Sequence, residues 1–326
     1  MKRKAIFLFI IILAISLSFC GKQPTYKHES VKRIDTGVEI GKWVLIPAGK
    51  FYAGQFNEET EINYDYEIML TDVTNQMFAD YLNKALSEGK VKVKDGKVLG
   101  YYKGEKYYGF RHELKIPEGD NYPYFILDEP GVRIRYENGK FIVDEGFENH
   151  PATLVTWFGA NAYCKAIGGD LPTEMEWEKA ARGNTKNPFP WGDDINPEYA
   201  NYSFSQKEIR KKVFGVDFQI TTPVGFFNGK EYNGFKTVNA VSPYGLYDMG
   251  GNVWQWVKDR YPKMSDRFMK GGSFRNYDIY LRIWSRNSAQ PHYGGINVGF
   301  RCVRKPVKTE EESTDTNKEE GLSENR

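Results

Sequence analysis

Histidine and cysteine are scarce in this chain, which has four of the first and three of the second among 326 residues. Metal sites built from imidazole groups usually show short histidine spacings such as His-x-His or His-x3-His, and none is present. A three-histidine metal site is therefore not expected, and each histidine is interpreted as a surface residue or a hydrogen-bonded core residue. The four are His28, His112, His150 and His292. A Gly-x-Ser-x-Gly nucleophile elbow is also missing.

An excess of charge of one sign is missing as well. Lys plus Arg number 45 and Asp plus Glu number 43, which leaves a formal net charge of +2. No basic stripe stands out, so nucleic acid is not an expected partner. The mean hydropathy is −0.60 and only one stretch is long and apolar, which excludes a protein with several membrane spans. The 15% of aromatic residues exclude a disordered chain.

The one apolar run lies at the N-terminus. Three basic residues at positions 2–4 precede fifteen uncharged residues, 5–19, and the run ends at Cys20. A basic segment followed by a short apolar segment is typical of a secretory signal, and this run is shorter than the ~20 residues that span a bilayer. A cysteine at the end of the run resembles a bacterial lipoprotein signal, in which the leader is removed and the cysteine takes the lipid.

This interpretation predicts a signal peptide over residues 1–19, lipidation at Cys20 and a tether over residues 20–40. It places the protein in the bacterial cell envelope, lipid-anchored to a membrane and facing the periplasm or the cell surface. Phe19 stands where a small residue is usual. An uncleaved anchor is therefore the open alternative.

The remaining cysteines, Cys164 and Cys302, lie far apart in the sequence. In an oxidising compartment, two such cysteines are most simply explained by a disulfide. Two buried free thiols are the alternative that the residues leave open.

Helices are predicted at three places. Thr74 predicts the N-cap of a helix over residues 75–86, and apolar residues at i, i+3, i+4 and i+7 predict a second helix over 157–167. Thr173 and Glu176 have the spacing of a capping box, which predicts the start of a third helix.

Strand signals are short and lie between glycine-rich turns. Residues 43–49 and 51–54 predict two strands across a glycine turn. The composition then changes over residues 87–149, which are rich in Gly, Lys and Tyr. Asp95 and Asn138 are each followed by glycine, between apolar stretches. The dipeptides Asp-Gly and Asn-Gly favour the type I′ turn of a hairpin. The segment is therefore interpreted as an insertion of hairpins and loops.

Residues 150–304 contain an ordered series of motifs. They are His150-Pro151, Val155-Thr156-Trp157, Leu171-Pro172-Thr173-Glu174, Pro190-Trp191-Gly192-Asp193, Asp248-Met249-Gly250-Gly251-Asn252-Val253-Trp254, Gly271-Gly272-Ser273 and Gly299-Phe300-Arg301-Cys302. Together with Asp72-Val73-Thr74-Asn75 upstream, their order and spacing resemble the formylglycine-generating enzyme family, also called the sulfatase-modifying factor family. The resemblance covers about residues 41–304 and is interrupted by the insertion.

The resemblance implies one α+β domain with a C-type-lectin-like formylglycine-generating-enzyme fold. Such a domain has little regular secondary structure, and here it would carry the hairpin-rich insertion. Cys164 and Cys302 match a disulfide pair of the family. Residues 305–326 follow the domain as an acidic tail, which is predicted to be disordered.

Enzymes of this family oxidise a substrate cysteine with oxygen and a copper ion held by two cysteines. Both cysteines follow the Gly-Gly-Ser motif, and thiolates suit copper(I) because they are soft ligands. The matching positions here hold Asn276 and either Asp278 or Leu281. No cysteine lies between 164 and 302, so neither copper binding nor catalysis of this type is expected.

Family members also bind structural calcium through side-chain and main-chain oxygens, the ligands that calcium prefers. The matching positions form two sets, Asn201, Tyr202, Asp217 and Phe218, and then Asp248, Gly251, Val253 and Gln255. Gln255 replaces the usual glutamate, so the second set should bind calcium more weakly. Hydrogen bonds from these side chains to loop amides are the open alternative.

Four residues match the substrate groove of the family, namely Trp254, Ser273, Arg275 and Asn276. An exposed arginine beside an aromatic floor suits a peptide or a glycan. Two functions remain open. The first is a non-catalytic envelope lipoprotein that binds a protein or glycan partner or scaffolds an envelope assembly. The second is an oxidoreductase of the formylglycine-generating type acting on protein cysteine, or a divergent metal-dependent oxygenase. The missing cysteine pair favours the first.

Overall fold

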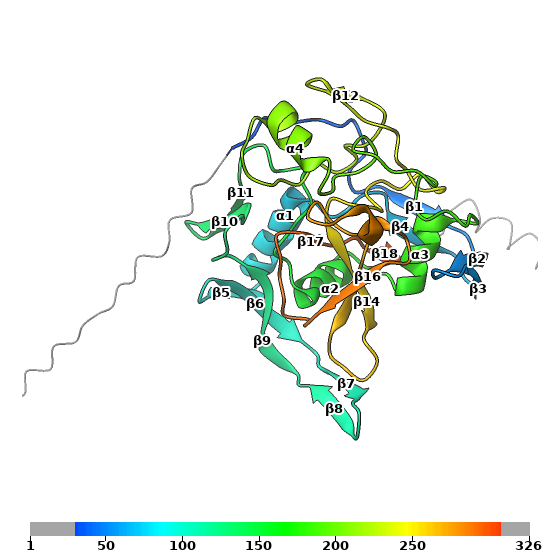
Figure 1. Cartoon of the computed structure of the whole chain (residues 1–326). Coiled ribbons are helices and arrows are strands. Elements are labelled where there is room, and N and C mark those ends of the chain that lie inside the picture. The colour runs from blue at the N-terminus through cyan, green and yellow to red at the C-terminus, as the bar shows by residue number, and fades with distance from the viewer. Residues whose placement is uncertain (1–29, 308–326) are drawn as a thin grey trace, which may run out of the picture.

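The computed structural model describes residues 30–307, which form an α+β fold with short elements and long loops (Figure 1). Within this range no helix is both long enough and apolar enough to cross a membrane. The predicted signal peptide, the lipidation site at Cys20 and residues 308–326 of the predicted tail lie outside the described residues.

Two sheets form the centre of the fold. The first is antiparallel with the order β1-β4-β18, and the second has the order β16-β15-β14-β17, in which only the β14–β17 pair is parallel. Their strands are β1 (Trp43–Ile46), β4 (Tyr66–Met69), β18 (Val303–Arg304), β14 (Trp254–Arg260), β15 (Arg267–Lys270), β16 (Arg286–Ala289) and β17 (Val298–Gly299). The first sheet therefore joins the start of the domain to its end.

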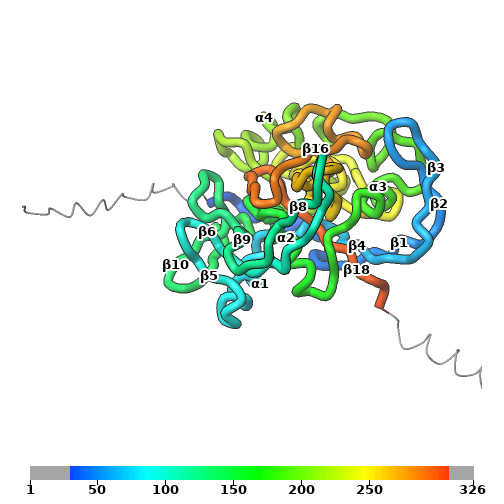
Figure 2. The backbone as a smooth tube through the Cα atoms, turned by 90° about the horizontal axis from the view of Figure 1, so that it is seen from below, coloured from blue at the N-terminus to red at the C-terminus, as the bar shows by residue number. Residues whose placement is uncertain are grey.

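The pairing of the first strands differs from the prediction. Residues 43–49 and 51–54 were expected to pair with each other, but β1 pairs with β4, and β2 (Gly49–Ala53) pairs with β3 (Glu58–Ile62). The β2–β3 hairpin lies at the edge opposite the insertion (Figures 1 and 2). The glycine turn thus redirects the chain from one sheet to another.

The three predicted helices are confirmed, and their caps explain where they begin. Thr74 Oγ1 accepts from the amide of Met77 at 3.3 Å, and Thr173 and Glu176 form the predicted capping box. The helical segments are α1 (Asn75–Ser87), α2 (Trp157–Ala166), α3 (Glu174–Arg182), the short α4 (Gln206–Glu208), a π-helical turn (Ile209–Phe214) and a 3₁₀ turn (Asp278–Leu281).

Aromatic side chains from distant elements fill the core. Phe78 on α1 lies 5.8 Å from Phe125 and 5.9 Å from both Tyr163 and Phe300, measured between ring centroids. Large rings supply the buried area that short strands cannot, which is why this loop-rich domain has a continuous core.

The insertion consists of hairpins, as predicted. Asp95 and Asn138 have φ values of 49° and 51° in the turns of β5–β6 and β10–β11. The strands are β5 (Val91–Lys94), β6 (Lys97–Tyr102), β7 (Glu105–Tyr108), β8 (Glu113–Ile116), β9 (Gly119–Ile126), β10 (Ile134–Glu137) and β11 (Lys140–Val143), and the small pair β12 (Glu231–Tyr232) and β13 (Phe235–Lys236) lies further along the chain. A Cβ on Gly159 would lie 2.1 Å from the carbonyl oxygen of Tyr124, so glycine lets α2 pack directly on β9.

The packed domain begins earlier than predicted. Val31 and Ile34 are buried in a cluster with Phe147 and Phe226, and Thr36 Oγ1 donates to the carbonyl of Val224 at 3.0 Å. Residues 31–36 were expected to form part of a tether over residues 20–40. They instead cover an apolar face of the domain, because their few apolar side chains find buried positions there.

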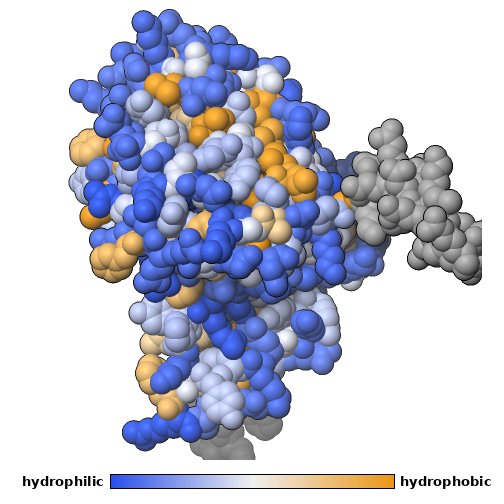
Figure 3. All heavy atoms as spheres, turned by 90° about the vertical axis from the view of Figure 1, so that its right-hand side faces the viewer, coloured by the Kyte–Doolittle hydropathy of each residue, from blue (hydrophilic) through white to orange (hydrophobic). Residues whose placement is uncertain are grey.

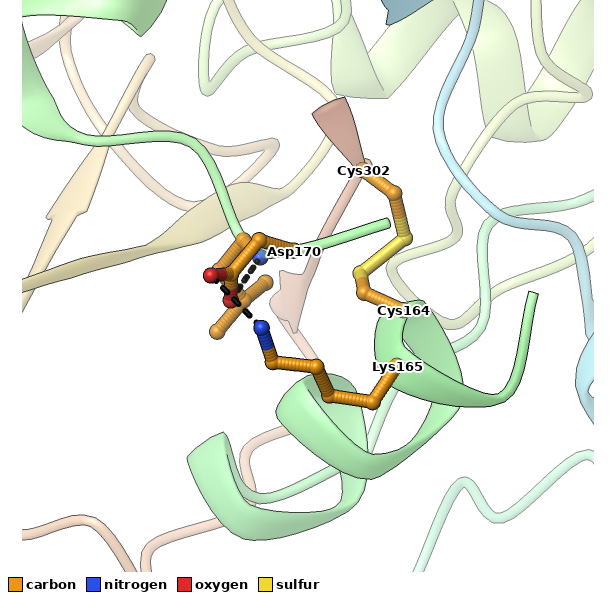
Figure 4. Close-up of a disulfide and its surroundings, with 5 residues drawn as sticks. Cys164, Lys165, Asp170 and Cys302 are labelled. Atoms are coloured by element: carbon orange, nitrogen blue, oxygen red, sulfur yellow. Dashed lines mark hydrogen bonds and ion pairs between the residues drawn. A yellow bond between two sulfur atoms is a disulfide. The ribbon is translucent and has the colours of Figure 1, made fainter. Parts of the chain in front are cut away.

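The predicted disulfide is present and lies in the core. Cys164 near the end of α2 bonds to Cys302 just before β18, with 5.5 Å between the Cα atoms and 138 residues between them in the sequence (Figure 4). Nearby, Lys165 and Lys258 both pair with Asp170, at 2.8 and 2.7 Å. The bond therefore ties helix α2 to the C-terminal strand of the first sheet.

Candidate functional site

Two glycines after β15 position the predicted groove residues. Gly271 and Gly272 have φ values of 94° and 72°, which favour glycine. A Cβ on Gly272 would lie 2.8 Å from the carbonyl oxygen of Tyr280. The turn therefore lets the 3₁₀ segment lie directly against Ser273 and its neighbours.

The structure brings Ser273 and Asn276 together. The buried hydroxyl of Ser273 donates to Asn276 Oδ1 at 2.5 Å and accepts from Asn297 Nδ2 at 3.1 Å. The carbonyl of Asn276 accepts from the amide of Ser203 at 3.0 Å. Ser273 thus positions Asn276, and Asn276 fixes the loop at 201–205 beside it.

Trp254 and Arg275 occupy different layers of this region. Trp254 is buried, and its ring lies 6.4 Å from that of Tyr280, edge to face. Arg275 is exposed, with its guanidinium 5.8 Å from the ring centroid of Phe274. Trp254 therefore supports the surface from below, while Arg275 is free to meet a ligand.

Exposed apolar side chains follow Arg275 in the chain, and one more packs beside them from another loop. These side chains, 46–59% exposed, are Tyr277, Ile279, Tyr280 and Phe204. Phe204 and Tyr277 come from separate loops, yet their ring centroids lie 5.6 Å apart. We call these four residues together with Arg275 the aromatic surface. Sequence reasoning missed all of them except Arg275, although three lie within seven residues of the Gly-Gly-Ser motif.

The positions that match the catalytic cysteines hold no soft ligand. Asn276 is half-buried and engaged by Ser273, and Asp278 is also partly buried. Leu281 is fully buried against Ala200 and Tyr202. An amide, a carboxylate and an alkyl group do not make a dithiolate site for copper(I). The residues present therefore do not fit that metal.

The first predicted calcium set does not converge on one point. Asn201 Oδ1 accepts from Gln206 Nε2, which also donates to the carbonyl of Ile220 at 2.8 Å. The side chain of Asp217 is 91% exposed and pairs with Lys211. The remaining members are Tyr202, whose carbonyl accepts from Ser205 Oγ at 3.0 Å, and Phe218, which packs beside an apolar cluster. The amide of Gln206 thus occupies the place between two oxygens that a cation would need.

The second set is a hydrogen-bond network. Gln255 Oε1 accepts from Trp177 Nε1 at 2.7 Å and from Arg301 Nε at 2.8 Å, and Gln255 Nε2 donates to the carbonyl of Asp248 at 2.7 Å. Asp248 Oδ2 accepts from the amide of Gly225 at 2.7 Å. A guanidinium beside the expected ligand oxygen opposes a cation, so this set does not fit calcium as arranged. Calcium binding stays a prediction of the resemblance.

Within residues 30–307, histidine supplies no alternative metal centre. His150 is buried between Phe147 and Phe214, and its Nδ1 lies 2.8 Å from Thr221 Oγ1. Burial lowers the pKa of His150 to about 3. Across residues 30–307, no three His, Cys, Asp or Glu side chains could share a metal ion. His150 therefore has the core role expected of a lone histidine.

Two buried carboxyl groups lie near Arg301. Burial raises the pKa of Asp72 to about 8, although the charge of Arg301 and its hydrogen bond to Asp72 lower it. Burial also raises the pKa of Asp248 to about 6, against the hydrogen bond from the Gly225 amide and the charge of Arg301. Both carboxyl groups are buried, so their titration acts on stability.

The raised pKa of Asp72 predicts a pH-dependent stability. The folded state holds a proton on Asp72 that the unfolded chain releases above about pH 4, so this contribution to stability is complete below about pH 4 and is lost by about pH 8. Asp72→Asn removes the titration. The free energy of unfolding of the wild type, minus that of Asp72→Asn, should fall as the pH rises from about 4 to about 8. The slope should be at most about 1.4 kcal/mol per pH unit. Urea unfolding of both proteins measures it, and a constant difference would contradict the raised pKa.

A comparison with known protein families agrees with the fold described above. Residues 29–306 match the family model for the sulfatase-modifying factor enzyme 1-like domain. The chain belongs to this family. Its fold matches the crystal structure of CarF, with a TM-score of 0.51, 20% identity and coverage of 82% of this chain and 99% of CarF. PvdO from Pseudomonas aeruginosa matches with a TM-score of 0.52 and 20% identity over 85% of this chain and 98% of PvdO.

The relatives of this chain include proteins named as a kinase, as an active enzyme and as an inactive enzyme. The serine/threonine-protein kinase pkn1 of Chlamydia caviae is 28% identical over 305 residues, which is 86% of this chain and 40% of that protein. The formylglycine-generating enzyme of Mus musculus is 35% identical over 184 residues, or 49% of this chain and 46% of the enzyme. The mouse inactive C-alpha-formylglycine-generating enzyme 2 is 34% identical over 173 residues, 50% of this chain and 51% of that protein. The chain thus spans about half or less of each.

Proposed function

We propose that this family domain is a non-catalytic binding module, and that the aromatic surface takes a protein or glycan partner. The observation that carries the proposal is the absence of any thiolate at Asn276, Asp278 and Leu281. The cysteines of the described range, Cys164 and Cys302, are bonded to each other in the core. Relatives named as inactive formylglycine-generating enzymes support a domain that is kept without the chemistry.

The aromatic surface suits recognition by its composition. Tyrosine rings offer large contact area with few rotatable bonds, and an arginine beside them adds hydrogen bonds to carbonyl, carboxylate or hydroxyl oxygens. Ser273 and Asn276 hold the segment by hydrogen bonds, so little conformational entropy is lost when a partner binds. A preorganised surface of this kind favours binding over turnover.

We further propose that the domain works in the bacterial envelope, where lipid on Cys20 anchors it to a membrane. The N-terminal sequence supports this part of the proposal. Cells fed a fatty-acid analogue should label the protein, and Cys20→Ser should abolish the label. Membrane retention of the unlabelled variant would favour an uncleaved anchor.

A peptide assay separates binding from catalysis. The purified protein, supplied with copper and a sulfatase-type cysteine peptide, should leave the cysteine unchanged in mass spectrometry, because no thiolate pair holds the metal. Asn276→Cys alone should also stay inactive, since one thiolate does not complete the site. A formylglycine-generating enzyme assayed in parallel is the positive control. Peptide oxidation by the unmodified protein would favour the hypothesis that it is a formylglycine-generating oxidoreductase.

Partner binding is tested by a photo-crosslinking residue at Tyr277 in intact cells. A discrete adduct should form there and weaken with Arg275→Glu, because both residues belong to the aromatic surface. The matched control places the same group at Phe56, another exposed aromatic residue on the β2–β3 hairpin. Identical adducts from both positions, or none at Tyr277, would contradict the proposal.

A further inference from the structure

The hairpin β7–β8 carries bare aromatic side chains at its end. It projects from the domain below the other strands of the insertion (Figure 1), and its turn is closed by a hydrogen bond from the Gly109 amide to the carbonyl of His112 at 2.9 Å. Tyr108 and Phe110 are 75% and 72% exposed. Seen from another side, a small group of hydrophobic residues lies at one edge of this mostly hydrophilic projection (Figure 3). Such side chains bury little apolar area in the fold itself.

The other face of the hairpin holds it in place. The Arg260 guanidinium lies 4.8 Å from the ring centroid of Tyr107, and Glu105 pairs with Arg260 at 3.6 Å and also with Arg267. The alternation of a strand puts Tyr107 and Tyr108 on opposite faces. Tyr107 therefore anchors the hairpin to β14, and Tyr108 points away from the body.

Basic side chains lie on the same hairpin as the exposed rings. Lys106 pairs with Glu113 at 2.9 Å, which leaves that carboxylate neutralised. Arg111 follows Phe110 directly, and Lys115 lies on β8 opposite Lys106. No ion pair joins Arg111 or Lys115 to a carboxylate of residues 30–307. We call Tyr108, Phe110, Arg111 and Lys115 the hairpin tip.

The neighbouring loop extends the same character. It connects β14 to β15, and its Lys263 ammonium lies 5.6 Å from the ring centroid of Phe110. Tyr261 and Met264 on this loop are 46% and 43% exposed. Two segments far apart in the sequence thus present apolar and basic groups together.

We propose that the hairpin tip enters the interface of an anionic phospholipid bilayer. The tip is convex, so it encloses no small molecule, whereas a bilayer accepts a protruding wedge. Tyr and Phe favour the interfacial layer, and Arg and Lys are attracted to anionic headgroups. This contact is independent of lipid on Cys20, and it goes beyond the partner binding proposed for the aromatic surface.

The β2–β3 hairpin provides a contrast within the same chain. Phe56 in its turn is 82% exposed, but Glu58, Glu59 and Glu61 follow on β3. Anionic headgroups repel these carboxylates. Both hairpins therefore carry an exposed phenylalanine, but basic side chains lie near Phe110 and acidic side chains lie near Phe56.

The test uses the chain from residue 21 onward, which contains every described contact and lacks the predicted leader and Cys20. Vesicles of phosphatidylcholine with phosphatidylglycerol should sediment the protein, and phosphatidylcholine alone should do so more weakly. The Tyr108→Ser/Phe110→Ser variant should lose at least about tenfold in partitioning, because two rings no longer enter the interface. Arg111→Ser/Lys115→Ser should lose about tenfold on the anionic vesicles alone.

Phe56→Ser is the matched control and should partition like the wild type. All variants should keep the wild-type melting temperature, since the replaced side chains are exposed. Phe110→Trp should retain binding, because tryptophan also favours the interface. Failure of the wild type to bind vesicles, as expected if the tip docks on a protein instead, would overturn the proposal. An equal loss in Phe56→Ser would overturn it too.

Discussion

The double variant Cys164→Ala/Cys302→Ala is expected to lose about 5 kcal/mol of free energy of unfolding, since the bond closes a loop of 138 residues and a long loop restricts the unfolded chain strongly. Both positions are fully buried. Alanine leaves no polar group there, so the loss reports the bond and a small cavity. Urea unfolding of the variant beside the wild type measures it.

A reductant supplies the control for this prediction. Reduction should lower the melting temperature of the wild type toward that of the double variant and should leave the variant unchanged. Both effects follow from one bond, because the described cysteines are only these two. A wild type that is indifferent to reductant under denaturing conditions would show that the bond does not form.

Features that depend on neighbouring residues were predictable from the sequence. The caps at Thr74 and Thr173 need only a side chain and an amide three residues later, and both helices begin there. The turns at Asp95 and Asn138 need only a residue that accepts positive φ before a glycine. Each signal is complete within four residues, so the rest of the fold cannot change it much.

Features that depend on distant partners were not predictable in this way. Residues 43–46 predict a strand, but its partner β4 lies beyond the β2–β3 hairpin, with Trp43 opposite Met69. The segment at 31–36 has only two apolar residues that become buried. Its packing is set by an apolar face built from residues more than a hundred positions away, which no local pattern describes.

The candidate site divides along the same line. Ser273 and Asn276 lie within four residues, so a motif was enough to bring them together. Phe204 joins the aromatic surface only through its contact with Tyr277 from another loop. The resemblance matched Gln255 and Asp248 with calcium ligands, but Arg301 takes the oxygen of Gln255 in this chain. That exchange depends on three segments meeting in the core.

Arg301→Met is expected to cost about 3–5 kcal/mol of stability, because removing one member of a buried polar network strands the others. Arg301 is fully buried and donates to the carbonyls of Met69 and Tyr247 at 3.1 and 2.8 Å, as well as to Gln255 and Asp72. Methionine fills a similar volume and donates nothing. The strands that Arg301 connects, β4 and β14, would then hold unpaired acceptors inside the core.

Arg304→Met provides the matched comparison three residues along the chain. Its guanidinium pairs with Glu67 at 2.5 Å, but both side chains remain partly exposed, so water replaces the lost contact and the cost should stay near or below about 1 kcal/mol. The same substitution at Arg301 leaves acceptors that water does not reach. The difference between the two variants in urea unfolding therefore measures burial rather than the loss of an arginine. Equal costs would mean that the oxygens around Arg301 are hydrated, and that the buried network adds no more to stability than an exposed ion pair does.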